Sequence, residues 1–508
     1  MNRPPPRNLT AALLALLILA GAFLRVRLAL DRPLWDDELW QRFVTREGSY
    51  LDFVLWRHDE LVHPPLSFIL NKLCCDLFKS DAAWVWRLPS LLAGILCIPA
   101  GFALGKKLGS SALALGVAAM LACDLNTAWE SANARMYSML ALEIVAALCI
   151  AIPLLNSRET LWRRAALLGV VLAAMFWTHM LAVLPWCALG LSAVVFAFRK
   201  DARQPFVSNL AIAFGFACLL GVPGILRFFA VREGVGAAVP DRTFGEVMHL
   251  LYWVTNLLVW IEVRLVSPLV LTLSVFGAFA MFRRSRATSL LLLALGLMTG
   301  LSQIHLLHTH PFSVMRYFIP AQPVLWIGLP FLFLIAPPPR LRAIAAAVFC
   351  LFVAVQSWNC TRLEFTYGTV ASNVRESRVF VDAVAFVKDN KSSADAVTYL
   401  PHDRYAYRGE YFGLPASESL GGPAQPAPPR FPHEPRTPPP LDAPASWIVE
   451  RVSPRAENSR DDAKVFDRLI KHYHPGHDGP DALGASAEHW LVTRIDRSGI
   501  TTRAFSIE

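Results

Sequence analysis

Three adjacent carboxylates, Asp36, Asp37 and Glu38, follow soon after the first apolar segment of the chain, Leu9 to Leu24. Carboxylates packed together beside a membrane repel one another and are costly to remove from water. They persist where they bind a cation, move a proton or orient a substrate. A lone Asp would be read as a solvated loop charge, but three in a row in an apolar chain favour a functional site.

Two arginines are candidate ligands for an anion. Arg135 and Arg316 each lie beside the expected outer end of an apolar segment and precede Met136-Tyr137 and Tyr317, respectively. A guanidinium can hold a phosphate through two parallel hydrogen bonds. From position alone, each Arg fits equally well as an interfacial side chain that extends to lipid headgroups, and a Tyr at this depth most often belongs to the aromatic belt.

Histidines on the same side of the chain suggest a metal ion as an alternative ligand. His305, His308 and His310 share one expected outer loop, and a spacing of two or three residues can place imidazoles around a divalent ion. For most of these histidines, including His179, hydrogen bonding to water or backbone is the favoured interpretation. His63 is the exception, because it opens a Pro-Pro element close to the acidic cluster in sequence. No metal ligand is assigned.

The composition indicates a membrane protein. Of 508 residues, 55% are hydrophobic and 17% charged, against about 25% charged residues in globular proteins. The net charge of +9 does not indicate nucleic acid as a partner, because Lys and Arg occur in short clusters between apolar segments. Such clusters are typical of cytoplasmic loops.

Apolar segments of about 20 residues, the length that crosses the hydrocarbon, predict an all-α polytopic protein with about eleven transmembrane helices. Basic clusters in alternate connections place those connections in the cytoplasm, so the acidic cluster and the candidate arginines fall on the outer face. We therefore expect a multi-pass protein of the inner (plasma) membrane with a periplasmic active site. The segments begin near Leu9, Trp84, Ser111, Ala134, Ala165, Leu181, Phe206, Leu265, Thr288, Tyr317 and Arg342.

Two outer segments are too short or too polar to count as spans. His63 to Phe78 is interpreted as an amphipathic helix along the interface, with Pro64 and Pro65 in its first turn. Phe244 to Glu262, with its tryptophans, is interpreted as a second interfacial helix.

The composition changes after residue 358. Residues 1–358 are predicted to form the membrane domain and the polar residues 359–508 a small external α/β domain, with structured segments at 383–400 and 445–452. Residues 423–440 are rich in Pro and predict a loop or linker.

Five motifs occur in the order found in a known superfamily, and the chain resembles the GT-C glycosyltransferases, the group of protein O-mannosyltransferases and the bacterial lipid A aminoarabinose transferase. The resemblance covers residues 1 to about 340. One difference is Asn133, at a position where many relatives carry Glu, which bears on metal dependence. The motifs are Asp37-Glu38, His63-Pro64-Pro65-Leu66, Arg87-Leu88-Pro89-Ser90, Ala134 to Ser138 and Arg316-Tyr317.

The resemblance implies a GT-C fold and transfer of a sugar from a polyprenyl-phosphate-linked donor to an acceptor lipid, glycan or protein. Asp37 is then the candidate general base, with Asp36 as its competitor. Glu38 is either an orienting group or a ligand of a divalent metal ion. The donor phosphate is expected at Arg135 and Arg316, and the remaining substrate-binding candidates are His63, Tyr137 and Tyr317.

Two other classes of protein remain. A transporter or flippase of a polyprenyl-linked substrate would also have many helices, but it is expected to carry charges near the middle of spans or internal repeats. A non-catalytic scaffold for the C-terminal domain does not explain why the polar motifs gather in the membrane-proximal loops.

Overall fold

The computed structural model describes residues 7–30, 32–56, 63–157, 159–197, 203–232, 245, 266–309, 315–361, 380–392, 396–400, 445–452, 489–496 and 499–506. The chain divides into two compact units. The first comprises Met1–Asp31 and Val44–Tyr367, and the second comprises Arg32–Phe43 and Gly368–Glu508. Helix α2 (Asp36–Glu47) contributes residues to both units.

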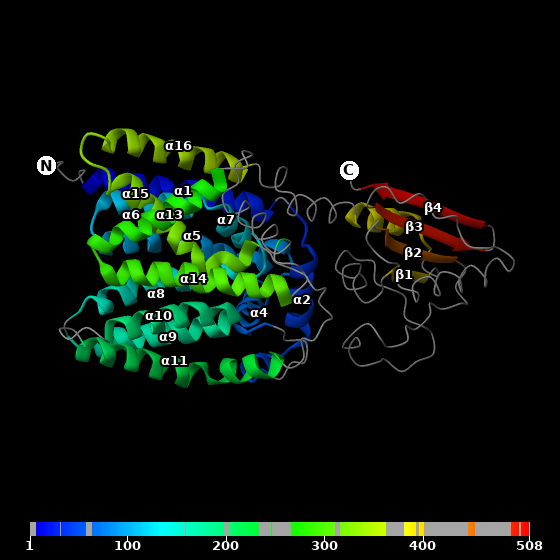
Figure 1. Cartoon of the computed structure of the whole chain (residues 1–508). Coiled ribbons are helices and arrows are strands. Elements are labelled where there is room, and N and C mark those ends of the chain that lie inside the picture. The colour runs from blue at the N-terminus through cyan, green and yellow to red at the C-terminus, as the bar shows by residue number, and fades with distance from the viewer. Residues whose placement is uncertain are drawn as a thin grey trace. The chain divides into compact units, whose positions relative to one another are not determined.

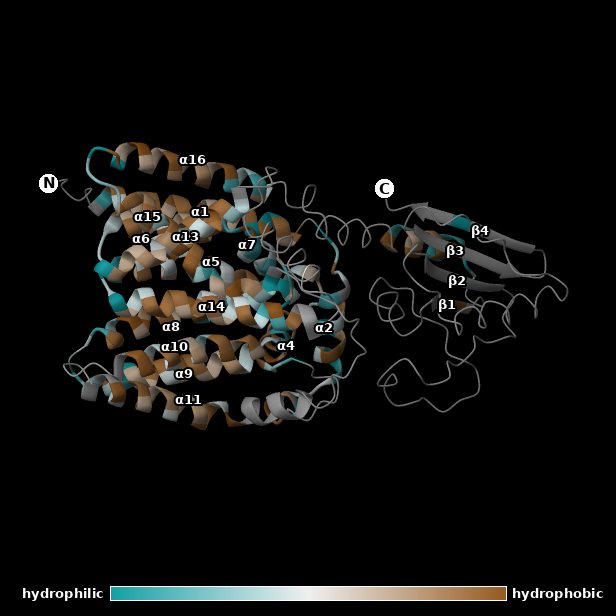
Figure 2. Ribbon diagram, in the orientation of Figure 1, coloured by the Kyte–Doolittle hydropathy of each residue, from teal (hydrophilic) through white to brown (hydrophobic). Residues whose placement is uncertain are grey.

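The first unit is a bundle of helices. Its long helices lie side by side (Figure 1) and are apolar along most of their length (Figure 2). Each apolar segment that the sequence predicts is helical. The elements are α1 (Arg7–Leu30), α3 (Tyr50–Val54), α4 (Leu66–Phe78), α5 (Ala83–Lys107), α6 (Ser111–Cys123), α7 (Leu125–Ser131), α8 (Tyr137–Leu155), α9 (Trp162–Thr178), η1 (Met180–Ala182), α10 (Val183–Ala197), α11 (Arg203–Arg232), α13 (Val266–Ala280), η2 (Met281–Arg283), α14 (Arg286–Thr309), η3 (Met315–Ala321), η4 (Val324–Gly328), α15 (Leu329–Leu334) and α16 (Arg342–Thr361).

Helix length and apolarity define the candidate membrane spans. In the described part of the chain, five helices are long and apolar enough to cross a membrane, namely α1, α5, α8, α14 and α16, and the bent pair α6 and α7 would make a sixth. Shorter apolar helices of 10–17 residues follow at Met180–Val195, Val207–Val222, Ser267–Arg283 and Val324–Leu334. The protein is therefore a multi-pass membrane protein by these criteria, and the count of about eleven crossings stays a prediction.

Helices α6 and α7 meet at Asp124 with a bend of 56°. The Asp124 carboxylate accepts hydrogen bonds from the Thr127 amide at 2.7 Å and the Trp326 indole at 2.9 Å. Buried Arg25 donates to carbonyls in the last turn of α6, including that of Leu121 at 2.7 Å. Both helix ends at the break thereby gain the partners that helix termini lack. The bend determines how α7 leads into the segment before α8.

Helix α4 begins at Leu66, with Pro65 as its N-cap residue. The sequence placed Pro64 and Pro65 in the first turn of this helix, whereas in the structure they directly precede it. The helix buries Phe68 and Asn71 and exposes Leu73 and Leu77. Its position along a membrane interface stays a prediction. The second predicted interfacial helix, 244–262, lies outside the described residues apart from Gly245.

The second unit contains a four-stranded sheet in the order β1-β2-β3-β4. Strand β1 (Ala396–Leu400) pairs in parallel with β2 (Ala445–Val452), whereas β3 (His489–Asp496) and β4 (Gly499–Ser506) continue the sheet in antiparallel fashion. Residues 380–390 are helical and bury Phe380, Ala383, Val384 and Val387. Both segments predicted to be structured, 383–400 and 445–452, thus contain regular elements. Helix α16 continues to Thr361, past the predicted boundary at 358, and the external location of this unit stays a prediction.

Candidate active site

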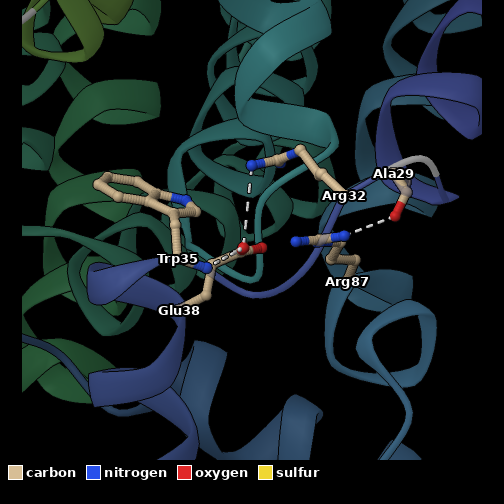
Figure 3. Close-up of polar contacts among 5 residues, drawn as sticks. All are labelled: Ala29, Arg32, Trp35, Glu38 and Arg87. Atoms are coloured by element: carbon tan, nitrogen blue, oxygen red, sulfur yellow. Dashed lines mark hydrogen bonds and ion pairs between the residues drawn. The ribbon is translucent and has the colours of Figure 1, made fainter. Parts of the chain in front are cut away.

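The acidic cluster forms the first turn of α2. The Glu38 carboxylate accepts a hydrogen bond from the Trp35 amide at 3.1 Å and lies 3.8 Å from the Arg32 guanidinium (Figure 3). The Glu38 and Arg32 side chains are 0% and 1% exposed. A Glu in the third helical position that turns back to the amide before the helix closes one half of a capping box. These contacts support the orienting role for Glu38 over the metal-ligand role.

Asp37 is partly exposed in the same turn, and the side chain of Asp36 lies outside the described residues. Negative side chains in a first turn interact favourably with the helix dipole, which provides a structural reason for part of the acidic cluster. The capping contacts use Glu38. The cap therefore leaves the role of Asp37 unexplained.

In the first unit, an arginine and two tyrosines from distant parts of the sequence meet. The Arg316 guanidinium carbon lies 5.0 Å from the ring centroid of Tyr137 and 5.9 Å from that of Tyr317. The centroids of the two tyrosine rings are 6.3 Å apart. The arginine therefore makes cation–π contacts with both rings. These contacts connect the start of α8 to η3.

Two histidines complete this group. The His179 ring centroid lies 4.9 Å from that of Tyr137 and 5.6 Å from that of His63. Arg135, which is 3% exposed, acts electrostatically on both imidazoles. The structure thus brings together all five residues that the sequence proposed for substrate binding. We call the group the arginine–aromatic cluster; it comprises His63, Arg135, Tyr137, His179, Arg316 and Tyr317.

Both histidines of the arginine–aromatic cluster are neutral near pH 7. Burial, followed by the positive charges of Arg135 and Arg316, lowers the pKa of His179 to about 3. Burial and then Arg135 are also the leading causes that hold the pKa of His63 well below its usual value. The net positive charge of the cluster therefore rests on its two arginines.

The hydrogen bonding of His179 determines which of its ring nitrogens is a donor. Its Nδ1 accepts a hydrogen bond from the Leu181 amide at 2.9 Å. In a neutral imidazole the proton then lies on Nε2. The buried Nε2 of His179 and the buried hydroxyl of Tyr137 have no hydrogen-bond partner within the described residues. Buried polar groups are normally satisfied, so these two groups are available to a partner beyond the described residues.

Hydrogen bonds connect the motif that ends at Ser90 to the motif that contains Arg135. The Ser90 hydroxyl donates to the carbonyl of Arg135, and the Ser138 hydroxyl donates to the carbonyl of Ser90 at 2.8 Å. In the C-terminal part of this unit, the Gln303 side-chain amide donates to the carbonyl of Tyr317 at 3.2 Å. Side chains of α5, α8 and α14 therefore fix the backbone on which the cluster is built.

Arg87, the first residue of the Arg87-Leu88-Pro89-Ser90 motif, has a structural contact. Its fully buried guanidinium donates to the carbonyl of Ala29 at 2.6 Å (Figure 3). Ala29 lies in the last turn of α1, where carbonyls lack helical partners and a cation is favoured. Arg87 thus stabilises the end of α1.

The arginine–aromatic cluster suits an anion better than a metal ion. Within the described residues, no three His, Cys, Asp or Glu side chains form a group that could hold a metal. His63 and His179 lie close together, but the charges of Arg135 and Arg316 disfavour a cation beside them. The side chain of His308 and all of His310 lie outside the described residues.

The sequence grouped His179 with the interfacial histidines and did not assign it to the site. One signal was present, because Thr178-His179 interrupts the apolar run of α9 on its expected outer side. The packing of His179 on Tyr137 and His63 depends on tertiary contacts that no local pattern reports.

No family model and no curated protein matches the sequence. Among solved structures, the chain is similar to ArnT from Cupriavidus metallidurans in the apo state, with a TM-score of 0.51 and 13% identity over 79% of this chain and 75% of that chain. It is also similar to ArnT bound to undecaprenyl phosphate, with a TM-score of 0.49, 14% identity and the same coverage. A further similar structure is the oligosaccharyltransferase AglB from Archaeoglobus fulgidus with an inhibitory peptide and a dolichol-phosphate, with a TM-score of 0.48 and 12% identity over 84% of this chain and 61% of that chain.

The likeness to apo ArnT shows that the chain shares the fold of that protein over 79% of its length. The resemblance that the sequence motifs indicated is therefore confirmed at the level of the fold.

Proposed function

We propose that the protein is a membrane glycosyltransferase that moves a sugar from a polyprenyl-phosphate-linked donor to an acceptor at the outer face of the plasma membrane. The observation that carries this proposal is the arginine–aromatic cluster. In it Arg135 and Arg316 share one site with two buried groups that have no hydrogen-bond partner in the described part of the chain, His179 Nε2 and the Tyr137 hydroxyl. The fold shared with ArnT, a protein also solved with undecaprenyl phosphate, supports the same class of donor.

The cluster has the chemistry of a phosphate site. Two guanidiniums supply charge and directed donors, and His179 Nε2–H and the Tyr137 hydroxyl can add two neutral hydrogen bonds. Neutral histidines contribute no charge, so the two arginines supply the positive charge of the site. The rings of His63 and Tyr317 supply the remaining contacts to the substrate. The polyprenyl chain would remain among the apolar helices.

The proposed reaction is displacement at the anomeric carbon of the sugar. The acceptor oxygen forms a bond to that carbon, and the bond from carbon to the phosphate oxygen breaks. Asp37 takes the proton of the acceptor hydroxyl, with Asp36 as the competing base, and Glu38 orients the turn that carries them. The departing polyprenyl phosphate gains negative charge, which Arg135 and Arg316 stabilise.

Release of polyprenyl phosphate tests the proposal whichever sugar and acceptor the protein uses. The full chain, reconstituted in liposomes, is supplied with undecaprenyl-phosphate-linked sugars and an envelope extract as the source of acceptors. We expect free undecaprenyl phosphate to accumulate with the wild-type protein and with Arg340→Ala, an exposed arginine outside the cluster, but not with Asp37→Asn. A transporter would move the donor across the bilayer without consuming it, and that result would overturn the proposal.

A further inference from the structure

An open cavity of about 330 Å³ lies apart from the arginine–aromatic cluster, with which it shares no residue. The end of α2, helix α4 and the start of α5 contribute its walls. Most of its lining side chains are charged, which is unusual in a chain with 17% charged residues. The principal lining residues are Arg46, Lys72, Asp76, Lys79, Asp81 and Trp86.

Both carboxylates of this cavity already have donors. Asp76 accepts a hydrogen bond from the Tyr50 hydroxyl at 2.6 Å. Asp81 accepts one from the Trp86 indole at 2.8 Å and lies 3.5 Å from the Arg46 guanidinium. These contacts fix both acidic side chains in the wall, and the ion pair with Arg46 occupies Asp81.

The two lysines, by contrast, form no ion pair with any carboxylate in the described part of the chain. The Lys72 ammonium lies 5.7 Å from the ring centroid of Tyr50. Lys79 follows the last residue of α4 in a left-handed conformation, with φ of 48°. A non-glycine residue meets steric crowding in that region, so the fold holds a lysine at this corner at a local cost. The cavity therefore presents two ammonium groups to a ligand.

Apolar side chains border the same corner. Phe78 and Trp84 pack edge to face with ring centroids 5.2 Å apart, yet they are 46% and 40% exposed. Leu77 is 72% exposed. Exposed aromatic pairs of this kind are typical of the boundary between headgroups and hydrocarbon. A ligand that fits both features has an anionic head and an apolar tail.

We propose that this cavity binds the phosphate-bearing headgroup of an anionic lipid. Lys72 and Lys79 contact the phosphate, while the acyl chains lie along Leu77, Phe78 and Trp84. Arg46 remains with Asp81 as part of the wall. The proposal is independent of the sugar-transfer function, because none of these residues belongs to the arginine–aromatic cluster or to the acidic cluster.

Photo-labelling of the full chain tests the lipid site. The purified protein in neutral detergent is exposed to phosphatidylglycerol with a photoreactive acyl chain, and labelled peptides are mapped by mass spectrometry. We expect label in the segment from α4 to the start of α5. The double change Lys72→Ala and Lys79→Ala should reduce it about 10-fold or more, the loss expected for removing charge-assisted contacts. The matched control, Lys106→Ala with Lys107→Ala, changes two exposed lysines at the other end of α5.

Three outcomes decide the matter. Retained labelling in Lys72→Arg with Lys79→Arg, together with loss in the alanine pair, supports a charged lipid site and shows that the loss is not due to misfolding. Equal labelling of the wild type and the alanine pair overturns the proposal. Loss of labelling when inorganic phosphate is added in large excess would assign the cavity to soluble phosphate and would overturn its assignment to a lipid.

Discussion

The guanidinium of Arg316 lies over the ring of Tyr137, 5.0 Å from its centroid, although Tyr137 begins α8 and Arg316 belongs to η3, far along the sequence. The aromatic face stabilises the cation without neutralising it. His179 packs on the same ring, 4.9 Å away between centroids. One tyrosine thus connects an arginine that keeps its charge to an imidazole whose Nε2 lacks a partner within the described residues.

Removal of either arginine of the cluster should weaken donor binding. We expect Arg135→Ala and Arg316→Ala each to reduce affinity for undecaprenyl phosphate about 10-fold or more, because each removes a charge-assisted contact. Lys should restore part of the affinity, since it supplies charge without the planar fork. The check is a binding titration in detergent with Arg340→Ala as the control. Unchanged affinity in both alanine variants would rule out this phosphate site.

Asp37 and Asp36 of the acidic cluster should contribute unequally to sugar transfer. Asp37→Asn should lower sugar transfer by roughly 10²-fold or more while donor binding persists, because the amide keeps the shape of the side chain but cannot take a proton. Asp36→Asn should have the smaller effect. Transfer rates and donor affinity are measured on the same preparations. If Asp36→Asn abolished transfer and Asp37→Asn did not, the two assignments would be exchanged.

Glu38 should act mainly on stability. Glu38→Ala removes an acceptor for the Trp35 amide and an ion-pair partner of buried Arg32, so we expect a loss of about 1–3 kcal/mol and a lower Tm. Glu38→Gln keeps an acceptor oxygen and should lie between the alanine variant and the wild type. Thermal unfolding in detergent compares them with Glu47→Ala at the exposed end of the same helix. A Tm for Glu38→Ala equal to that of the control would contradict the capping role.

The stability of the protein should depend on His179 in acid. Its pKa of about 3 in the folded state lies below the unfolded value, so between these two pKa values the unfolded chain binds a proton that the folded chain does not. The stabilisation is therefore complete above the unfolded pKa and is lost as the pH falls toward 3. As the pH is lowered from 7 to 4, the Tm of the wild type should fall further than that of His179→Asn. Parallel curves for the two proteins would show that His179 is not held neutral.

Much of the helical architecture follows from the sequence, because the backbone N–H and C=O groups of a long apolar segment in a membrane must form hydrogen bonds within the segment. The bend at Asp124 was not predicted, since an averaging window of about 20 residues conceals one polar residue in an apolar run. Strands β3 and β4 were also missed, although β3 is rich in aromatic and β-branched residues such as Trp490 and Val492. Such enrichment favours a strand and was the signal that could have located β3.

The residues of the arginine–aromatic cluster were named from motifs, whereas their arrangement could not be read from sequence. Arg135 depends on the Ser90 hydroxyl, and Tyr317 on the Gln303 amide. Such contacts join segments far apart in the chain. The same applies to His179 and to the cavity lined by Lys72 and Lys79. The sequence of α4 shows that charged residues are present there, but it does not show that they line a cavity.

A structure of the full chain in nanodiscs with undecaprenyl phosphate tests the central claim most directly. The account predicts phosphate density within hydrogen-bond distance of both the Arg135 and Arg316 guanidiniums, with His179 Nε2 and the Tyr137 hydroxyl as further contacts. Phosphate bound elsewhere, with the arginine–aromatic cluster unchanged and empty, would contradict it.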